Sequence, residues 1–475
     1  MNRTAKKILS VILALTMIFT AIIPSYAMTE TSWNSYWTTD EAQSGLTMFP
    51  GSNETERNFT WYTKTESTPV VELKIFGEPS IESFQGVCSA TKDGRYVNHV
   101  TVTNLEPGLT YSYKCKSEGF ESRAYSFYVE DDNSFSALYV TDVHVSYSET
   151  NAEHLSDTAY SFNQVIEAAK AKSKSLSLVL SAGDQASEGR EDEYIGFASS
   201  PDGRTLSIAP TIGNHDRKGI AFKSYKNVPN EQVNPMVSSY IGGNYWFVKG
   251  DVLFLVMDTN NGSGTDHARF VRNAIKENPD VKWKVMIAHH DLYGGRIPHR
   301  ESENQFLRLL WAPIVDQFGI DLVLLGHSHF YTVSNVLYNS KTVSPVTNNA
   351  TLTDPAGTIY MVSGSLNRPR GEAEDVPLGE NIGIDYLTQE KIYNIIDFSD
   401  NSITVKSYTL ESNEMFASYT IEKTTDEGGH PDKLLDFYQP IVRFIGTIYA
   451  FFNNIGVYSD LTEDGIDIGF FEAIF

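Results

Sequence analysis

Six of the eleven histidines lie in short clusters with other residues that can bind metals. Each cluster follows an apolar run, so we expect each at the carboxyl end of a strand, where α/β folds place their ligands. One histidine after one strand is usually structural, but five strand ends that all present carboxylate, amide or imidazole groups predict a metal site. The clusters are Asp142-Val143-His144, Gly183-Asp184, Gly213-Asn214-His215-Asp216, His289-His290 and Gly326-His327-Ser328-His329.

The spacing and chemistry of these residues indicate a two-metal centre. Residues two apart in extended backbone point to the same side, so Asp142 and His144 can aim into one site. The clusters lack cysteine, which excludes a thiolate zinc or iron–sulfur site, and their oxygen and imidazole ligands suit Mn, Fe or Zn. They offer too many ligands for one ion. Two ions about 3.5 to 4 Å apart that share a carboxylate fit better and recur in phosphoester hydrolysis.

The sequence around the clusters alternates apolar strands with helical patterns. This alternation predicts an α/β domain over residues 135–425 that holds the clusters at its strand ends. The predicted strands are 136–140, 176–180, 253–257, 284–288, 322–325, 358–362, 392–398, 402–408 and 417–422, and the predicted helices are 158–172, 267–277 and 303–318.

The preceding segment, 33–132, has a different pattern. Short alternating runs such as 99–103 and 110–114 are separated by turn signals, which predicts a β-sandwich. This segment contains both cysteines of the chain, Cys88 and Cys115. In an exported protein they could form a disulfide, or they could remain two unpaired buried thiols.

The first 27 residues have the features of a secretory signal peptide. Three basic residues precede an apolar run, and small residues stand at Ala27 and Ser25. We expect cleavage after Ala27 and a secreted or cell-surface protein; an uncleaved membrane anchor is the alternative. The remaining chain has 34 basic and 60 acidic residues, a net charge near −26. This charge argues against a surface that coats nucleic acid.

The tail from 430 to 475 is rich in aromatic residues, but Pro440, Arg443 and Gly446 interrupt it too often for a membrane span. It could be an amphipathic helix docked on the protein or a partner, a contact with a membrane surface or cell wall, or a disordered tail.

The ordered clusters resemble the calcineurin-like metallophosphoesterases, whose pattern is DxH, GDxx, GNH(D/E), a strand-end His and GHxH. The resemblance covers about residues 135–370. The earlier segment, especially Trp61 and the run from His99 to Tyr113, is similar to the fibronectin-type N-terminal sandwich of purple acid phosphatases. Together they point to the bacterial purple acid phosphatase-like group. They imply an α/β fold, a two-sheet metallophosphoesterase sandwich flanked by helices, behind an all-β fibronectin III-like sandwich.

The resemblance also implies a role for each motif residue. Asp184 would bridge two metal ions, and His289 is favoured over His290 because the family places its ligand directly after the strand. His215 would contact the phosphate and assist the departing oxygen, while Asp216 either orients that imidazole or caps the loop. One ion would be held by Asp142, His144 and His329, the other by Asn214, His289 and His327.

The implied activity is hydrolysis of a small-molecule phosphate ester by metal-activated water attack, without a covalent phosphoenzyme. A phosphomonoesterase is favoured over a phosphodiesterase. The rival interpretation is a cell-surface binding protein built on an inactive scaffold, but no ligand position is lost. A different two-metal hydrolase, such as an amidase, is less consistent with the GNHD and GHSH motifs. Candidate substrate-binding residues in the loops are Arg217, Arg296, His299 and Arg300.

One position departs from the purple enzymes. Their GDxxY motif supplies a tyrosinate to iron, whereas Ser187 stands at that place here, and Asp142 is followed two residues later by His144 rather than Gly. We therefore expect no purple colour, which leaves both a ferric ion and a strongly acidic pH optimum without support.

Overall fold

The computed structural model describes residues 28–39, 45–118, 120–151, 153–232, 242–294, 301–371 and 378–425. The expected signal peptide and the aromatic tail lie outside these residues. Among the described residues, no helix combines the length and apolar character that a membrane span needs.

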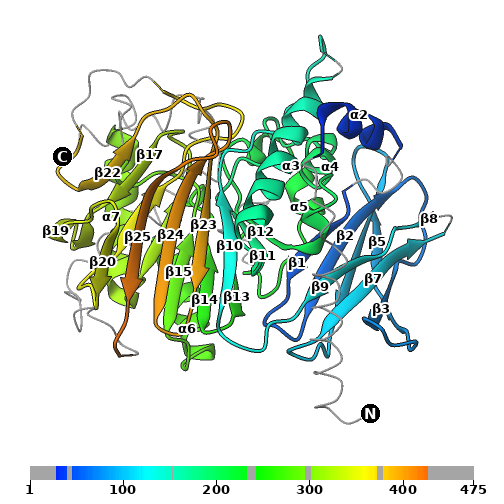
Figure 1. The fold of residues 1–475 in the computed structure, drawn as a ribbon, viewed down its shortest axis with the longest axis horizontal. Coiled ribbons are helices and arrows are strands. Elements are labelled where there is room, and N and C mark those ends of the chain that lie inside the picture. Colours follow the sequence, from blue (N-terminus) through cyan, green and yellow to red (C-terminus); the bar gives the residue numbers. More distant parts are fainter. Residues whose placement is uncertain are drawn as a thin grey trace.

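Two sheets that pack face to face form the centre of the molecule (Figure 1). In the larger sheet, the strands β10 (Phe135–Val140), β11 (Leu176–Ser181) and β12 (Ser207–Pro210) run parallel. On the other side of β10 follow β23 (Ile392–Phe398), β24 (Ser402–Thr409), β25 (Met415–Glu422) and β20 (Ala350–Thr353). The second sheet contains β13 (Tyr245–Lys249), β14 (Val252–Val256), β15 (Trp283–Ile287), β16 (Leu322–Leu325), β21 (Ile359–Val362), β17 (Tyr331–Ser334) and β22 (Ile382–Tyr386).

Apolar side chains fill the space between the sheets, among them Tyr139, Leu180, Phe254 and Leu324. The outer face of the larger sheet is covered by α3 (His154–Lys172), α4 (Glu191–Phe197) and α5 (Ala221–Tyr225), and that of the second sheet by α6 (Gly264–Glu277) and α7 (Glu301–Phe318). Central strands such as β10 and β16 are therefore buried on both faces, which is why they read as continuous apolar runs. The α/β fold with two sheets flanked by helices is confirmed.

The N-terminal region is rich in β-strands, as expected, but it shares a sheet with the rest of the molecule. Strand β1 (Thr47–Pro50) pairs in parallel with β12, and Met48 lies opposite Ser207. The strands β2 (Arg57–Thr63), β6 (Tyr96–Val102) and β5 (Val87–Ala90) continue the larger sheet beyond β1. The other sheet of this region contains β3 (Val70–Ile75), β4 (Glu82–Gln85), β7 (Thr110–Ser117), β8 (Phe120–Glu121) and β9 (Tyr125–Tyr128).

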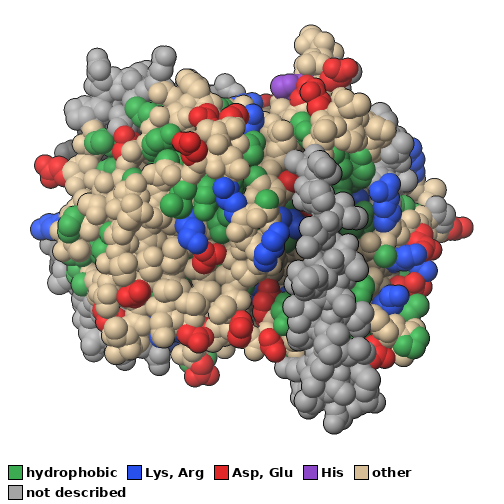
Figure 2. Space-filling model, viewed as in Figure 1, with side chains coloured by type: hydrophobic (Ala, Val, Ile, Leu, Met, Phe, Trp, Pro, Cys, Tyr) green, Lys and Arg blue, Asp and Glu red, His purple; other side chains and the backbone are tan. Residues whose placement is uncertain are grey.

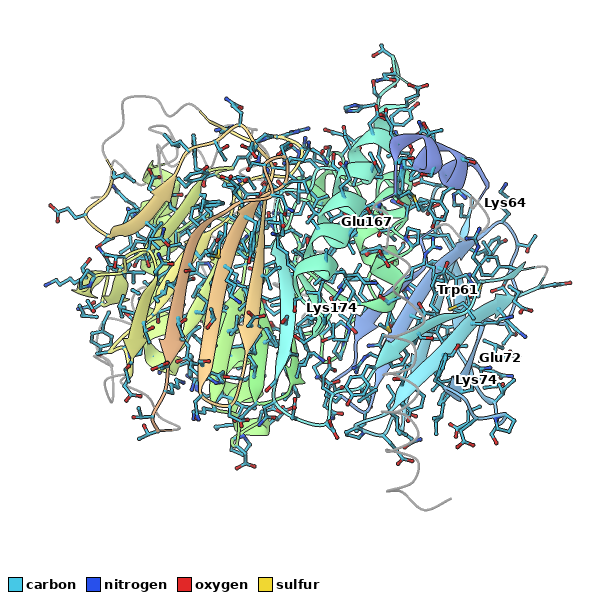
Figure 3. All side chains as sticks on the ribbon, in the orientation of Figure 1. Trp61, Lys64, Glu72, Lys74, Glu167 and Lys174 are labelled. Atoms are coloured by element: carbon cyan, nitrogen blue, oxygen red, sulfur yellow. The ribbon has the colours of Figure 1, made fainter. Side chains whose placement is uncertain are left out.

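Trp61 lies in the core of this N-terminal region (Figure 3), and its indole N–H donates to Ser117 Oγ at 3.0 Å. Both cysteines are free thiols, as in the second alternative, but only Cys115 is buried, whereas Cys88 is partly exposed. Cys115 is fully buried in β7, and burial raises the pKa of its thiol well above the ordinary value. The stability of this region therefore comes from its apolar core.

Residues that the sequence assigned to the start of the sandwich form a helix instead. This helix, α2 (Glu30–Thr39), packs on α3 through Trp33, whose indole N–H donates to Ser156 Oγ at 3.0 Å. The sequence reading missed it because its apolar residues are aromatic and few, so the helical period is weak.

The remaining short elements are the 3-10 turns Gly203–Thr205 and Asp216–Lys218 and the hairpin of β18 (Val336–Tyr338) with β19 (Lys341–Ser344). On the face drawn in Figure 2, acidic and basic side chains of the described residues are interspersed.

Candidate metal centre

All predicted ligands meet at one edge of the two-sheet core. Asp142 follows β10, Asp184 follows β11 and Asn214 follows β12, all from the larger sheet. His289 follows β15 and His327 follows β16 in the second sheet. The carboxyl ends of parallel strands in both sheets thus face one site, as the strand-end argument requires.

The first group of ligands surrounds the Asp142 carboxylate. Its Oδ1 lies 3.2 Å from His329 Nε2 and 3.7 Å from His144 Nε2, and these two nitrogens are 3.3 Å apart. Its Oδ2 accepts hydrogen bonds from the Thr141 hydroxyl and from the His327 backbone N–H, at 2.7 and 2.8 Å. One oxygen is therefore fixed by the protein, while the other faces the two imidazoles.

The second group lies around Asp184 and Asn214. Asp184 Oδ2 is 3.2 Å from His289 Nε2 and 3.8 Å from His144 Nε2. Asn214 Oδ1 is 3.0 Å from both His289 Nε2 and His327 Nδ1. Asp184 thus lies between an imidazole of the first group and one of the second.

Backbone carbonyls fix which nitrogen several of these histidines present. His289 Nδ1 donates to the Ala182 carbonyl at 2.8 Å, and His329 Nδ1 donates to the Arg368 carbonyl at 3.0 Å. Since a carbonyl only accepts, both Nδ1 atoms carry a proton, and Nε2 is the nitrogen of each ring that a metal ion could bind. His327 has the opposite orientation, with Nδ1 toward Asn214.

The backbone at the ligands is strained. Asp142, His144, Asp184, His327 and His329 all have positive φ, between 47° and 73°. For residues with a Cβ this conformation costs on the order of 1–3 kcal/mol each, and such strain is typical of functional sites. Contacts elsewhere in the fold must therefore hold five of the predicted ligands in this unfavourable backbone conformation.

The motif glycines let the ligand loops approach one another. A Cβ on Gly213 would lie 2.1 Å from Asp184 Oδ1, and one on Gly326 would lie 1.9 Å from Thr141 Oγ1 and 2.6 Å from Asp142 Oδ2. Any side chain at Gly213 or Gly326 would therefore collide with a ligand from another motif, Asp184 in the first case and Asp142 in the second.

Carboxylates and imidazoles in the site shift one another's pKa values. Burial favours the neutral acids, but neighbouring imidazoles overcome it and hold the pKa values of Asp142 and Asp184 below their usual range. Burial likewise opposes the charged form of His289, yet the Asp184 carboxylate outweighs it and raises the pKa of His289 to about 9. A metal ion bound at Nε2 of His289 would displace the proton that this raised pKa favours.

These residues fit a pair of metal ions. Three buried groups of carboxylates and imidazoles have ligand atoms within 4.8 Å of one another: Asp142 with His144 and His329, His144 with Asp184 and His215, and Asp142 with Asp184 and His289. Asp142 Oδ1 is buried, has no hydrogen-bond partner among the described residues and faces two imidazole nitrogens. An oxygen so placed is satisfied by a cation.

His215 lies beside the first group, with its ring edge-to-face against His144 at a centroid distance of 4.7 Å. Its Nδ1 donates to the Ser187 carbonyl at 2.7 Å. That carbonyl, and not Asp216, orients the imidazole, so the proposed orienting role of Asp216 is wrong. Asp216 caps the loop: its carboxylate accepts from the backbone N–H groups of Asp184 and Gly213, both at 2.8 Å.

The Asp216 carboxyl is fully buried and also accepts from the Tyr194 hydroxyl at 2.7 Å. Burial and the nearby Asp184 charge raise its pKa to about 7. Asp216 therefore acts on the centre by holding the backbone of the ligand loops.

The structure distinguishes the two neighbouring histidines and places one of the four candidate substrate-binding residues. His289 lies against Asp184 and Asn214, whereas Nδ1 of His290 pairs with Thr259 Oγ1 at 2.7 Å. Arg217 donates to the Asn260 carbonyl at 3.4 Å beside His215. Arg296, His299 and Arg300 lie outside the described residues.

The sequence reading missed Arg368. Its carbonyl orients His329, and its exposed guanidinium donates to Ser187 Oγ at 3.3 Å. A cation thus stands next to the position where the purple enzymes have their tyrosine. No motif surrounds Arg368, so only its position shortly after β21 (Ile359–Val362), at the same edge of the sheet, could have indicated it.

Comparisons with known proteins agree with this geometry. The sequence model for the calcineurin-like phosphoesterases matches residues 135–331, and the model for the purple acid phosphatase N-terminal domain matches 42–129. Purple acid phosphatase 23 of Arabidopsis thaliana is 25% identical over 387 residues, 71% of this chain and 76% of that protein. An uncharacterized protein of Mycobacterium tuberculosis is 25% identical over 184 residues, 33% of this chain and 34% of its own.

Solved structures share the fold. Purple acid phosphatase PPD1 from yellow lupin (Lupinus luteus) seeds superposes with a TM-score of 0.68 at 15% identity, over 81% of this chain and 75% of that one. PhoD superposes with a TM-score of 0.54 at 12% identity, over 85% of this chain and 98% of that one. The purple acid phosphatase family uses a binuclear metal centre, which agrees with the clustered ligands. The chain therefore contains a region similar to the calcineurin-like phosphoesterases, over residues 135–331, behind a region similar to the N-terminal domain of purple acid phosphatases, over 42–129; both groups consist of metal-dependent phosphoester hydrolases.

Proposed function

We propose that this protein is an exported phosphomonoesterase with two metal ions bridged by Asp184. The observation that carries the proposal is the place of Asp184 Oδ2, 3.2 Å from His289 Nε2 and 3.8 Å from His144 Nε2. One carboxylate between two imidazole groups can serve both ions. Asp142, His144 and His329 would hold one ion, and Asn214, His289 and His327 the other.

When bound, the two cations would neutralise the phosphate and activate the attacking water. The protein's own residues then position the substrate. His215 has its Nδ1 proton held by Ser187, so Nε2 is the nitrogen that can exchange a proton with the departing oxygen. Its ring is fixed against His144, and its backbone N–H donates to Asp184 Oδ1 at 2.8 Å, so its position follows that of the bridging carboxylate.

Two arguments support the finer parts of the proposal. The similarity to a plant purple acid phosphatase over most of both chains favours phosphate monoesters as substrates. The basic start, apolar run and small residues of positions 1–27 favour export.

The test is hydrolysis of p-nitrophenyl phosphate and of bis-p-nitrophenyl phosphate by the mature protein, stripped of metal and then reloaded with Mn, Zn or Fe. We expect turnover to return only with metal and to be faster with the monoester. Faster cleavage of the diester would refute the monoester preference. No turnover with either compound despite two bound metals per chain would favour the inactive scaffold.

A further inference from the structure

The backbone nitrogen of Met28 lies directly against a carboxylate. It donates to both oxygens of Glu167 on α3, the helix on which Figure 3 labels Glu167, at 3.1 Å to Oε1 and 3.0 Å to Oε2. The carbonyl of Met28 in turn accepts a hydrogen bond from the Tyr160 hydroxyl at 2.5 Å. Both backbone groups of this residue are therefore held by the same helix.

Glu167 lies in surroundings that favour a cationic partner. Its side chain is half-buried and also accepts from Asn163 Nδ2 at 3.0 Å. The neighbouring Lys170 on the same helix pairs with Asp202, with 2.7 Å between Lys170 Nζ and Asp202 Oδ1. Burial raises the pKa of Glu167, although the hydrogen bonds from Met28 and Asn163 act against this. Its two donors, the Met28 N–H and the Asn163 amide, are both neutral, so they compensate this carboxylate only in part.

The sequence independently predicts that the peptide bond before Met28 is cleaved. Positions 1–27 are the expected signal peptide, and its expected cleavage site is the Ala27–Met28 bond. Hydrolysis of this bond by an export peptidase consumes one water: the Ala27 carbonyl becomes a carboxylate, and the Met28 nitrogen becomes a primary amine. The ordinary pKa of such an α-amino group is about 7.7–8.0, so it is mainly an ammonium at neutral pH.

We propose that Glu167 is the binding site for the amino terminus that export processing creates at Met28. Cleavage replaces one neutral N–H donor with an ammonium that has three, at the same position between the two carboxylate oxygens. The mature protein thereby gains a partly buried ion pair that the precursor lacks. This inference rests on the proposed export and does not depend on the catalytic activity.

The ion pair would fix α2 on α3. Trp33 of α2 packs against Tyr160 at a centroid distance of 5.5 Å, and the Tyr36 hydroxyl donates to the Ser199 carbonyl at 2.8 Å. Helix α3 is connected to the metal centre, because Asn367 Nδ2 donates to the carbonyls of both Thr158 and Val143, at 3.0 and 2.6 Å. Val143 lies between the ligands Asp142 and His144, so processing would brace the element next to the first ion.

The first experiment is N-terminal sequencing of the protein exported by a bacterial host that carries the full chain. We expect the sequence to begin at Met28. A mature protein that begins elsewhere, or one that keeps the leader, would overturn the proposal at its first step. This result is independent of phosphatase activity, so it separates failure of the inference from failure of the proposed reaction.

The second experiment is a double-mutant cycle on melting temperature. One pair of proteins begins at Met28 and differs by Glu167→Gln; the other pair carries one added glycine before Met28, so that the Met28 nitrogen stays an amide. We expect Glu167→Gln to lower the melting temperature by about 1–3 °C more in the first pair. Asp157→Asn, an exposed carboxylate on the same helix, is the control and should not depend on the added glycine. Equal effects of Glu167→Gln in both pairs would overturn the proposal.

Discussion

Replacing Gly213 by alanine tests whether the motif glycines hold the ligand loops together. Gly213 precedes Asn214, and its φ is not in the left-handed region, so alanine suits the local backbone. The added Cβ would lie 2.1 Å from Asp184 Oδ1 and 2.5 Å from the Asp184 backbone nitrogen. The perturbation is therefore steric and is directed at the bridging carboxylate.

The size of the effect follows from these distances. Carbon and oxygen atoms in contact lie roughly 3.5 Å apart, so Asp184 or Gly213 must move by more than about 1 Å to relieve the 2.1 Å approach. Asp184 cannot move freely, since its N–H donates to Asp216 and its Oδ1 accepts from His215, both at 2.8 Å. Overpacking of this kind costs about 1–3 kcal/mol of stability, and a displacement of 1 Å at a catalytic group can cost on the order of 100-fold in turnover.

The assay compares Gly213→Ala with Gly379→Ala, whose added Cβ would meet no atom within 4 Å. We expect Gly213→Ala to bind less than two metals per chain, to lose about 100-fold in kcat and to remain folded. Gly379→Ala should match the wild type in metal content, kcat and melting temperature. Two bound metals and wild-type turnover in Gly213→Ala would refute the argument that this contact positions Asp184.

Three further predictions follow from the same structure. Asp184→Asn removes the charge that both ions would share, so it should abolish two-metal loading and turnover together, measured as metal per chain and kcat. Ser187 supplies no phenolate, so the metal-loaded protein should show no strong visible charge-transfer band in its absorption spectrum. Burial opposes ionisation of Glu54, but Arg57 and Lys249 outweigh it and lower its pKa from 4.5 to about 2, a shift worth about 3 kcal/mol before solvent screening is discounted. Glu54→Gln should therefore destabilise the protein by about 2 kcal/mol above pH 5, and the difference should shrink as the pH falls toward 2, measured by urea unfolding.

The ligands could be predicted from the sequence because each is tied to a local pattern. A buried strand reads as an apolar run, and its carboxyl end is fixed by the next polar residue, so Asp142 and Asp184 could be placed without tertiary information. The apolar runs at β14, β15 and β16 were located within one residue of their observed ends for the same reason.

The features that the sequence reading missed depend on long-range contacts. The pairing of Met48 with Ser207 joins the N-terminal region to the larger sheet, and no local pattern reports a partner more than 150 residues away. The partner of His215 is a backbone carbonyl, which has no sequence signature, so the sequence left two roles open for the adjacent Asp216, and the capping role is the one found. Arg368 was missed because loop closure alone brings it next to Ser187.

The same observations explain why the site is built on strands that are buried on both faces. Positive φ at five ligands costs on the order of 1–3 kcal/mol each, and the two buried carboxylates add an electrostatic cost until a cation binds. Loops alone could not keep this arrangement, because relaxation of one ligand would relieve the strain. The preceding strands β10, β11 and β16 are fixed by the apolar layer between the sheets and by the helices outside them. Packing of the core therefore offsets the strain and holds the ligands in position before binding. Binding of the metals and the phosphate then does not have to include the free-energy cost of ordering the site.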